Sequence, residues 1–353
     1  MGLFSIVVAP AIGRRGPFGP RREPGGLSCG AATGARLRLN EPRPRSVQNS
    51  TQQEASSMLR PVIVGIDGSP ESLAAAGWAA REAQRRDTAL RLVHAWAWSP
   101  HPSCAVLPAI SQRHWAQRIL REARDHLGAS YPHLDVEESE VEGLAPAVLM
   151  EASSGGALLV LGSRGISGLA GYLSGSVALH LTARSTTPVV LVRAGEQACD
   201  ARQLNAEGRS STDTPYRDIV LGIDLAHPSE EALGFAFEVA RSRGAVLRVL
   251  HCYRPGPIAA TGSGAAVSPE AAAECKSALD ALVRPWRERY PETVLTTMAR
   301  PGRAQSLLLH AASGAGLLVL GRRERLRPGP YTRPVIHAAM HHARCPMATV
   351  PHV

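Results

Sequence analysis

The segment PVIVGIDGSP at residues 61–70 joins a strand pattern directly to the start of a helix. Its apolar run, Val62–Ile66, is typical of a strand buried on both faces of a parallel sheet. An Asp-Gly pair then marks a turn, and Ser69 followed by Pro70 has the pattern of a helix N-cap with proline at the first helical position. The segment therefore predicts the opening of an α/β unit, in which each strand leads into a helix.

The same alternation of strands and helices continues to the end of the first unit. This order indicates a five-stranded parallel sheet covered by helices on both faces, because the chain must cross over between parallel strands. After the first strand, we expect strands at Ala89–Ala95, Leu134–Val141, Ala157–Leu161 and Pro188–Arg193, and helices from Ser69, at Ser111–Gly128, from Pro146 and at Val177–Arg184.

The whole pattern then repeats. VIVGID at 62–67 returns as IVLGID at 219–224, and SSGGALLVLG at 153–162 returns as ASGAGLLVLG at 312–321. A repeat of this length predicts two tandem domains of one α/β architecture. The predicted organisation is a disordered Arg/Gly/Pro-rich tail at 1–57, a first domain at 58–195, a linker at 196–215 and a second domain at 216–353.

Composition limits the class of protein further. Apolar residues make up 44% of the chain, enough for a substantial core, and no apolar run is long enough to span a bilayer. The formal charge of +9 comes largely from the tail, which holds eight arginines against three glutamates, so nucleic-acid binding is not expected. Six scattered cysteines without a C-x-x-C pair argue against a zinc site and a disulfide framework. We therefore expect a cytoplasmic protein without membrane binding or a metal site.

The stretch GSRGISGLAGYLSGS at 162–176 follows the predicted fourth strand and precedes the fourth helix. In an open parallel sheet, ligands bind beyond the carboxyl ends of the strands, where the strand order reverses. Gly162 and Asp67 are both expected at that edge, as the ends of the neighbouring fourth and first strands. Glycines let backbone N–H groups approach an anion, and Ser176 begins a helix whose positive end favours negative charge. The stretch predicts an electropositive cradle of main-chain amides for phosphates; a plain connector and a purely turn-forming Asp67 are the structural alternatives.

Gly162, Gly165, Gly175 and Ser176 match the pattern G-x2-G-x9-G-[S/T] without a gap, and the sequence resembles the nucleotide-binding branch of the universal stress protein superfamily. The resemblance covers both repeats. It implies tandem Rossmann-like sandwiches of the adenine nucleotide alpha hydrolase-like type that bind ATP, with or without Mg²⁺, and act in stress adaptation. It places adenine and ribose at Asp67 and the backbone near Ala95, and phosphates at the glycines. The full set of implied cofactor-binding residues is Asp67, Ala95, Gly162, Arg164, Gly165, Gly175, Ser176 and Val177.

The second repeat departs from this pattern. At the aligned positions, Glu324, Pro334 and Val335 replace two glycines and the serine. These replacements add a carboxylate and remove an amide donor and a hydroxyl, so we expect one competent nucleotide site, in the first domain. An anion site based on charge alone is left open by four arginines nearby: Arg322, Arg323, Arg325 and Arg327.

Two other classes of function stay open. The only lysine, Lys276, is not part of a G-x4-G-K-[ST] loop, so no catalytic residue is predicted and slow ATP hydrolysis is kept only as an alternative. The other alternative is a module of the same fold that binds no nucleotide and acts through protein contacts. His94 and His251 at equivalent strand ends are interpreted as packed structural residues rather than catalysts. On the last helix, His337, His341 and His342 are interpreted as surface residues rather than metal ligands.

The fifth strand of each repeat is expected at an edge of its sheet. An edge strand presents unpaired backbone groups that can bind another strand. We predict that Val189–Arg193 pairs with Met347–Val350 of the same chain, which gives an internally two-fold arrangement; a further homodimer is left open.

Overall fold

The structure is a computed structural model that describes residues 60–353 except 97–108, 164–175, 210, 255–268 and 325–333. All of these described residues belong to one compact unit, Val47–Val353. The predicted tail at 1–57 lies outside the described residues, and so do three of the predicted site residues: Arg164, Gly165 and Gly175.

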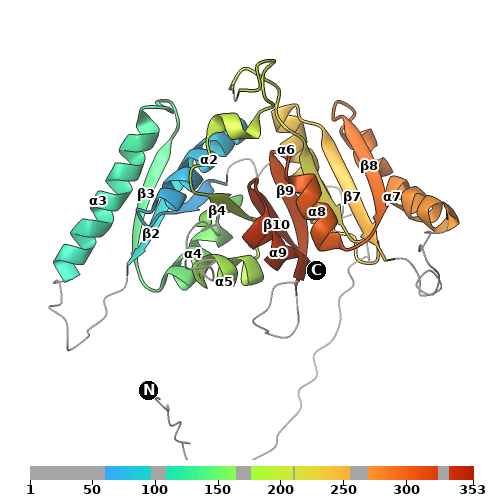
Figure 1. The fold of residues 1–353 in the computed structure, drawn as a ribbon. Helices are drawn as coiled ribbons and strands as arrows, with labels where there is room; N and C mark the ends of the chain where they lie inside the picture. The colour runs from blue at the N-terminus through green and yellow to red at the C-terminus, as the bar shows by residue number, and fades with distance from the viewer. Residues whose placement is uncertain (1–59, 97–108, 164–175, 210, 255–268, 325–333) are drawn as a thin grey trace, which may run out of the picture. The chain divides into compact units, whose positions relative to one another are not determined.

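Strands and helices alternate in both halves of the described chain, as the sequence predicts (Figure 1). The first half contains β1 (Val62–Gly65), α2 (Pro70–Arg86), β2 (Leu90–Trp96), α3 (Ala109–Gly128), β3 (Val136–Glu142), α4 (Ala145–Ser154), β4 (Leu158–Ser163), α5 (Ser176–Arg184) and β5 (Val189–Arg193). A short 3-10 helix, η1 (Ala198–Ala201), follows. The second half contains β6 (Ile219–Ile223), α6 (Glu230–Arg243), β7 (Leu247–Tyr253), α7 (Pro269–Arg289), β8 (Leu295–Pro301), α8 (Ala304–Ala312), β9 (Leu317–Arg323), α9 (Pro334–His342) and β10 (Met347–His352).

The strands form one sheet in the order β3-β2-β1-β4-β5-β10-β9-β6-β7-β8. Neighbouring strands are parallel within each half, and the first and fourth strands are neighbours in both halves. The two halves meet at β5 and β10, which pair antiparallel with Ala348 opposite Val190. The predicted pairing of the fifth strands within one chain is therefore present, and it joins both halves into a single sheet.

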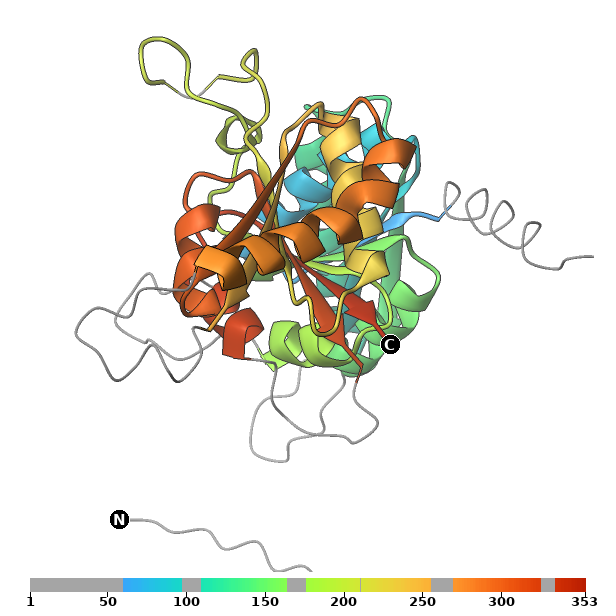
Figure 2. The ribbon, with the colours of Figure 1, turned by 90° about the vertical axis from the view of Figure 1, so that its right-hand side faces the viewer.

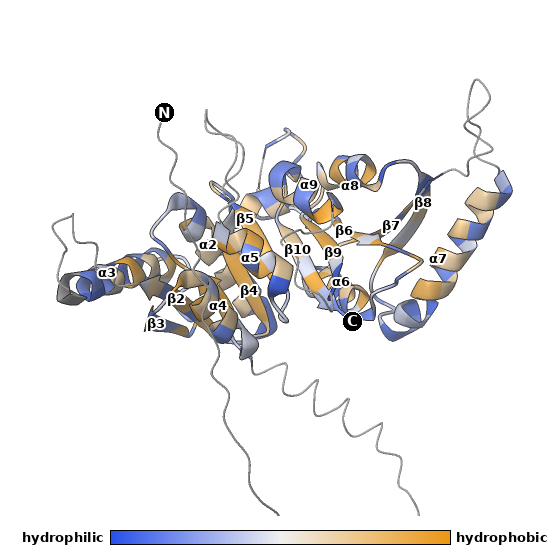
Figure 3. Cartoon of the chain, turned by 90° about the horizontal axis from the view of Figure 1, so that it is seen from below, coloured by the Kyte–Doolittle hydropathy of each residue, from blue (hydrophilic) through white to orange (hydrophobic). Residues whose placement is uncertain are grey.

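The core lies on both faces of this sheet, as expected for parallel strands covered by helices (Figure 2). Successive residues of β1 point to opposite faces: Val62 and Val64 belong to the cluster that includes α2, α3, α6 and α7, whereas Ile63 belongs to the cluster that includes α4, α5, α8 and α9. Figure 3 shows the inner strands β4 and β5 as mostly hydrophobic, while α3 carries hydrophilic residues along its length. Burial on both faces therefore explains the continuous apolar runs in the sequence.

Buried charges also connect the two halves. Glu82 of α2 and Arg243 of α6 each have a side chain that is 1% exposed, and their Oε2 and Nη2 atoms lie 3.2 Å apart. Arg81 of α2 holds Glu196, whose Oε2 lies 2.6 Å from its Nη2. The predicted linker at 196–215 therefore begins with a residue that is packed against the first half, and it includes η1.

Candidate functional site

A cavity of about 300 Å³ lies at the carboxyl ends of β1 and β4, where the strand order of the first half reverses. This is the position at which open parallel sheets bind ligands. It is lined by residues from both strand ends, from the start of α2, from β2 and from α4 and α5: Gly65, Ile66, Asp67, Ser69, Glu71, Ser72, Val93, Ala95, Ala145, Leu149, Leu161, Gly162, Ser176, Val177 and Ala178. The structure thus brings together five predicted site residues: Asp67, Ala95, Gly162, Ser176 and Val177.

Asp67 organises the loop between β1 and α2. Its Oδ1 accepts hydrogen bonds from the backbone N–H of Ser69 at 3.0 Å and from the Ser69 hydroxyl at 2.5 Å. The Ser69 hydroxyl oxygen in turn accepts the N–H of Ser72 at 3.2 Å and caps α2. Asp67 therefore has the turn-forming role considered as a structural alternative, and it also lines the cavity.

Gly162 is required by packing. A Cβ atom at this position would lie 2.6 Å from the carbonyl carbon of Glu71 and 2.8 Å from the backbone nitrogen of Ser72. The prediction that strand four ends at Gly162 is wrong by one residue, because the ladder continues to the pair Ser163–Arg193. The close first turn of α2 is thus a packing reason for glycine at this position, in addition to the predicted approach of phosphate, which stays a prediction.

The start of α5 faces the cavity with Ser176 and Val177. Ser176 is the first residue of the helix and is exposed, Val177 is half-buried, and Ala178 is buried. The first N–H groups of a helix have no partner within the helix, and they carry its positive dipole end. The parts of the predicted phosphate cradle that the structure describes are therefore Gly162 and this helix start.

The described side-chain charges of the cavity are negative, while most of the loop predicted to form the electropositive cradle lies outside the described residues. Asp67 and Glu71 contribute carboxylates, and no lysine or arginine is among the lining residues that the structure describes. Glu71 was not among the predicted site residues, although an acidic residue in the first turn of the helix that follows Asp67 is a signal that could have found it. Positive potential in the described part comes from the backbone at the start of α5.

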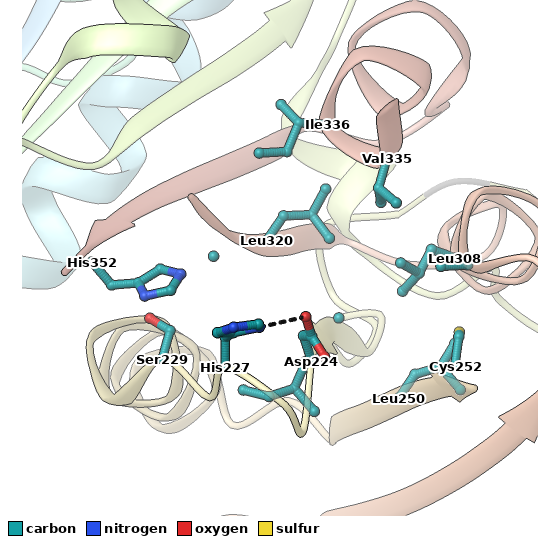
Figure 4. A pocket seen from close by; sticks show the side chains of 14 residues that line it. Asp224, His227, Ser229, Leu250, Cys252, Leu308, Leu320, Val335, Ile336 and His352 are labelled. Carbon is teal, nitrogen blue, oxygen red and sulfur yellow. Dashed lines mark hydrogen bonds and ion pairs between the residues drawn. The ribbon is translucent and has the colours of Figure 1, made fainter. Parts of the chain in front are cut away.

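The second half has a corresponding cavity of about 250 Å³ at the ends of β6 and β9 (Figure 4). Asp224 takes the place of Asp67, and its Oδ2 lies 3.5 Å from Nδ1 of His227. Val335 occupies the position of Ser176 at the start of α9, one residue after Pro334. His352 also lines this cavity, and its ring would lie 3.3 Å from a Cβ atom at Gly321. The second cavity therefore lacks the serine and carries an imidazole beside its strand-end glycine.

Two of the arginines near this second cavity are described, and one of them serves the junction. Arg322 is buried, and its guanidinium donates hydrogen bonds to the carbonyl of Ala183 at 3.1 Å and to that of Ser185. Both acceptors lie at the end of α5 in the first half. Glu324 donates its backbone N–H to the carbonyl of His352 at 2.7 Å. The charge of Arg322 is thus directed to the other half rather than to a ligand of the second cavity.

The strand-end histidines are buried and held by the backbone. Nδ1 of His94 lies 2.7 Å from the carbonyl oxygen of Ile66, and Nδ1 of His251 lies 3.0 Å from that of Ile223. On α9, burial and the neighbouring His337 and His342 lower the pKa of His341. In the part of the chain that the structure describes, no group of three or more histidine, cysteine, aspartate or glutamate side chains could hold a metal ion. No described helix is both long and apolar enough to cross a membrane.

Similarity to known proteins is found in both halves of the chain. The sequence profile of the universal stress protein family matches residues 58–193 and 215–351. A universal stress protein of Mycolicibacterium smegmatis is 30% identical over 273 residues, which cover 75% of this chain and 87% of that protein. The crystal structure of a universal stress protein from Archaeoglobus fulgidus has a TM-score of 0.57 at 14% identity, over 82% of this chain and 98% of that chain. A universal stress protein solved in complex with cAMP is 31% identical over 38% of this chain and 98% of that chain, with a TM-score of 0.31.

Proposed function

Because the chain belongs to the universal stress protein family, we propose that it binds ATP in the cavity of its first half and acts as a nucleotide-dependent regulator of a stress response. The observation that carries this proposal is the cavity at the carboxyl ends of β1 and β4. Its lining contains every predicted cofactor-binding residue that the structure describes. Its volume of about 300 Å³ is also in the range of small-molecule sites.

The proposed orientation of ATP follows from the chemistry of the lining. Val93, Ala95 and Leu149 offer apolar surface for a purine ring. The carboxylate of Asp67 is an acceptor suited to a ribose hydroxyl or an exocyclic amine. The phosphates would lie toward Ser176 and Val177, where the N–H groups and the dipole of α5 favour negative charge.

Mg²⁺ is proposed to accompany the nucleotide. The triphosphate would otherwise be repelled by the carboxylates of Asp67 and Glu71, which line the same cavity. Carboxylate and phosphate oxygens are the ligands that Mg²⁺ prefers, so Glu71 would hold the ion beside the phosphates while Asp67 accepts from the nucleoside. The ion would supply the positive charge that the described side chains do not.

A regulatory role is proposed in preference to turnover of ATP. The only lysine, Lys276, hydrogen bonds Thr297 at 2.9 Å between α7 and β8, and does not line the first cavity. The second half is proposed to have a structural role, because Val335 and His352 stand where a phosphate cradle would need a hydroxyl and open space. Slow hydrolysis and a module that binds no nucleotide are the competing functions.

Calorimetric titration of the full chain with MgATP tests the proposal. Ser176→Asp places a carboxylate at the helix start, and we expect it to weaken MgATP binding at least about tenfold. The matched control is Val335→Asp, which makes the same change at the start of α9 and should leave the affinity within about twofold. Gly165→Glu, which copies the residue of the second repeat, is expected to weaken binding as well.

The competing functions give different results. Titration without saturable binding in the wild-type chain would indicate the module that binds no nucleotide. Equal weakening by Ser176→Asp and Val335→Asp would refute the assignment to the first half. Steady phosphate release over many turnovers would identify an ATPase instead of a regulator.

A further inference from the structure

A third cavity, of about 320 Å³, lies at the junction of the two halves and shares no lining residue with either strand-end cavity. The first half and η1 contribute the segment after β5, with Arg193, Glu196 and Asp200. The second half contributes Arg217 before β6, the end of α8, and Arg344 with the residues that lead into β10. The cavity therefore exists only where β5 and β10 bring the halves together.

Three guanidinium groups line this junction cavity. Nη2 of Arg193 donates to the carbonyl of His341 at 2.7 Å, and Nε of Arg217 donates to the carbonyl of Arg202 at 2.6 Å. Arg344 is exposed. Within the described residues, none of these three arginines forms an ion pair with a carboxylate. Neutral carbonyls thus position Arg193 and Arg217, and no described ion pair balances the charge of any of the three arginines.

The acidic side chains of the lining do not neutralise this cluster. Both carboxylate oxygens of Glu196 bind Nη2 of Arg81, at 2.7 and 2.6 Å, so its charge is balanced outside the cluster. Asp200 is exposed, and its Oδ2 accepts the backbone N–H of Gln197 at 2.9 Å. Among the described lining residues, the carboxylate of Asp200 is therefore the negative charge left to oppose the three arginines.

The same groups influence one another across the cavity. Burial lowers the pKa of Arg193, the thiol of Cys345 opposes this shift, and the positive charge of Arg344 adds to it. Burial raises the pKa of Cys345 to about 12, against the charges of Arg193 and Arg217. The arginines of both halves therefore act on the same small volume, in which an anion would relieve their repulsion.

We infer that the junction cavity binds a small phosphate-bearing anion between Arg193 of the first half and Arg217 and Arg344 of the second. Guanidinium groups bind phosphate oxygens through charge-assisted hydrogen bonds of matching geometry. Inorganic phosphate and a phosphomonoester share this chemistry. The site is separate from the proposed nucleotide cavity, and an anion there would stabilise the pairing of the halves because both contribute ligands to it.

Calorimetric titration of the full chain with inorganic phosphate and with glycerol 3-phosphate, at constant ionic strength set by chloride, tests this inference. Arg344→Ala is expected to weaken binding at least about fivefold, since it removes an exposed charge from the lining. Arg284→Ala is the matched control, because Arg284 is exposed on α7 and lies outside the cavity, and it should change the affinity less than about twofold. Asp200→Asn removes the opposing carboxylate and is expected to tighten binding.

The titrations are repeated in the Ser176→Asp background, in which the proposed nucleotide cavity is blocked. Binding that persists there, and still depends on Arg344, supports the junction site whether or not ATP binds the first half. The compound that binds with the higher affinity shows whether the cavity prefers the free ion or a phosphomonoester. No saturable binding by the wild-type chain, or equal weakening in Arg344→Ala and Arg284→Ala, would overturn the inference.

Discussion

The buried carboxylate of Glu82 is the point at which a single substitution tests how the halves are held together. It accepts hydrogen bonds from Arg85 at 2.9 Å, from Arg86 at 2.8 Å and from Arg243 of the other half at 3.2 Å. The side chains of Arg85 and Arg86 are 15% and 21% exposed, whereas that of Arg243 is 1% exposed. Glu82→Gln would therefore leave Arg243 as the charge that cannot reach water.

The magnitude follows from this difference in burial. Removing one partner of a buried ion pair costs about 3–5 kcal/mol, so Glu82→Gln is expected to lower the free energy of unfolding by that amount. Arg243→Met should cost less, roughly 1–3 kcal/mol, because Glu82 keeps Arg85 and Arg86 and the methionine can pack against Trp78. The double variant Glu82→Leu with Arg243→Met should recover stability to within about 1 kcal/mol of wild type.

The pH dependence gives a second measurement of the same pair. Burial alone would raise the pKa of Glu82, but the charges of Arg86, Arg243 and Arg85 outweigh it and hold the pKa well below the ordinary value of 4.5. Because the pKa of Glu82 is lower in the folded chain than in the unfolded chain, the ion pair stabilises the fold at pH values above the unfolded-state pKa. This stabilisation decreases as the pH falls below about 4.5. Urea unfolding followed by circular dichroism at pH 7 and pH 4 should show a smaller acid loss in Glu82→Gln. A cost below about 1 kcal/mol at pH 7, or an unchanged acid loss, would refute the reasoning.

Three further predictions follow from other contacts. Gly162→Ala should lower the free energy of unfolding by about 2–3 kcal/mol, and Gly321→Ala should lower it by less. The reason is that the nearest atom would lie 2.6 Å from the new Cβ at position 162 but 3.2 Å from it at position 321. Urea unfolding of both variants measures the two free energies. Arg322→Met leaves two carbonyls at the end of α5 without their donor, so a loss of about 1–3 kcal/mol and faster amide exchange in α5 are expected. Burial raises the pKa of Cys345 to about 12, so iodoacetamide at pH 8 should modify Cys199 in the folded chain before Cys345, as mass spectrometry of the peptides would show; equal rates would contradict it.

The architecture could be predicted from the sequence because it depends on patterns that are local. Apolar runs bounded by glycine or proline, such as Val62–Ile66, define buried strands, and β1 was located to within one residue. The internal repeat then required the same topology twice. The pairing of the two halves could also be predicted, because the fifth strand of each repeat lies at the edge of its sheet and its unpaired backbone groups need a partner strand. The order and pairing of the strands could therefore be predicted without knowledge of the packed side chains, whereas strand ends such as that of β4 differed by one or two residues.

The site was predictable only in part, because its details depend on contacts between distant residues. Gly162 was interpreted from its motif, while its packing reason, the first turn of α2, becomes visible only when β4 and α2 are placed together. Glu71 could not be assigned to the cavity for the same reason, because its place in the lining depends on how α2 packs against the ends of β1 and β4. The role of Arg322 could not be predicted either, since its hydrogen-bond partners at the end of α5 lie more than one hundred residues away along the chain.

These contacts make α5 an element that both halves share. Its first residue, Ser176, faces the proposed nucleotide cavity, and the carbonyls of Ala183 and Ser185 at its other end accept hydrogen bonds from Arg322 of the second half. A helix of nine residues spans about 13 Å and moves as a rigid body, since each of its turns is fixed by hydrogen bonds to the next. A ligand that moves the start of α5 toward the strand ends must therefore strain the hydrogen bonds that Arg322 donates at the other end of the helix. In the opposite direction, Arg193 at the end of β5 donates a hydrogen bond to the carbonyl of His341 near the end of α9, but the start of α9 carries Pro334 and Val335. The two halves are thus linked at both helices, while the features proposed to bind phosphate occur at only one of them.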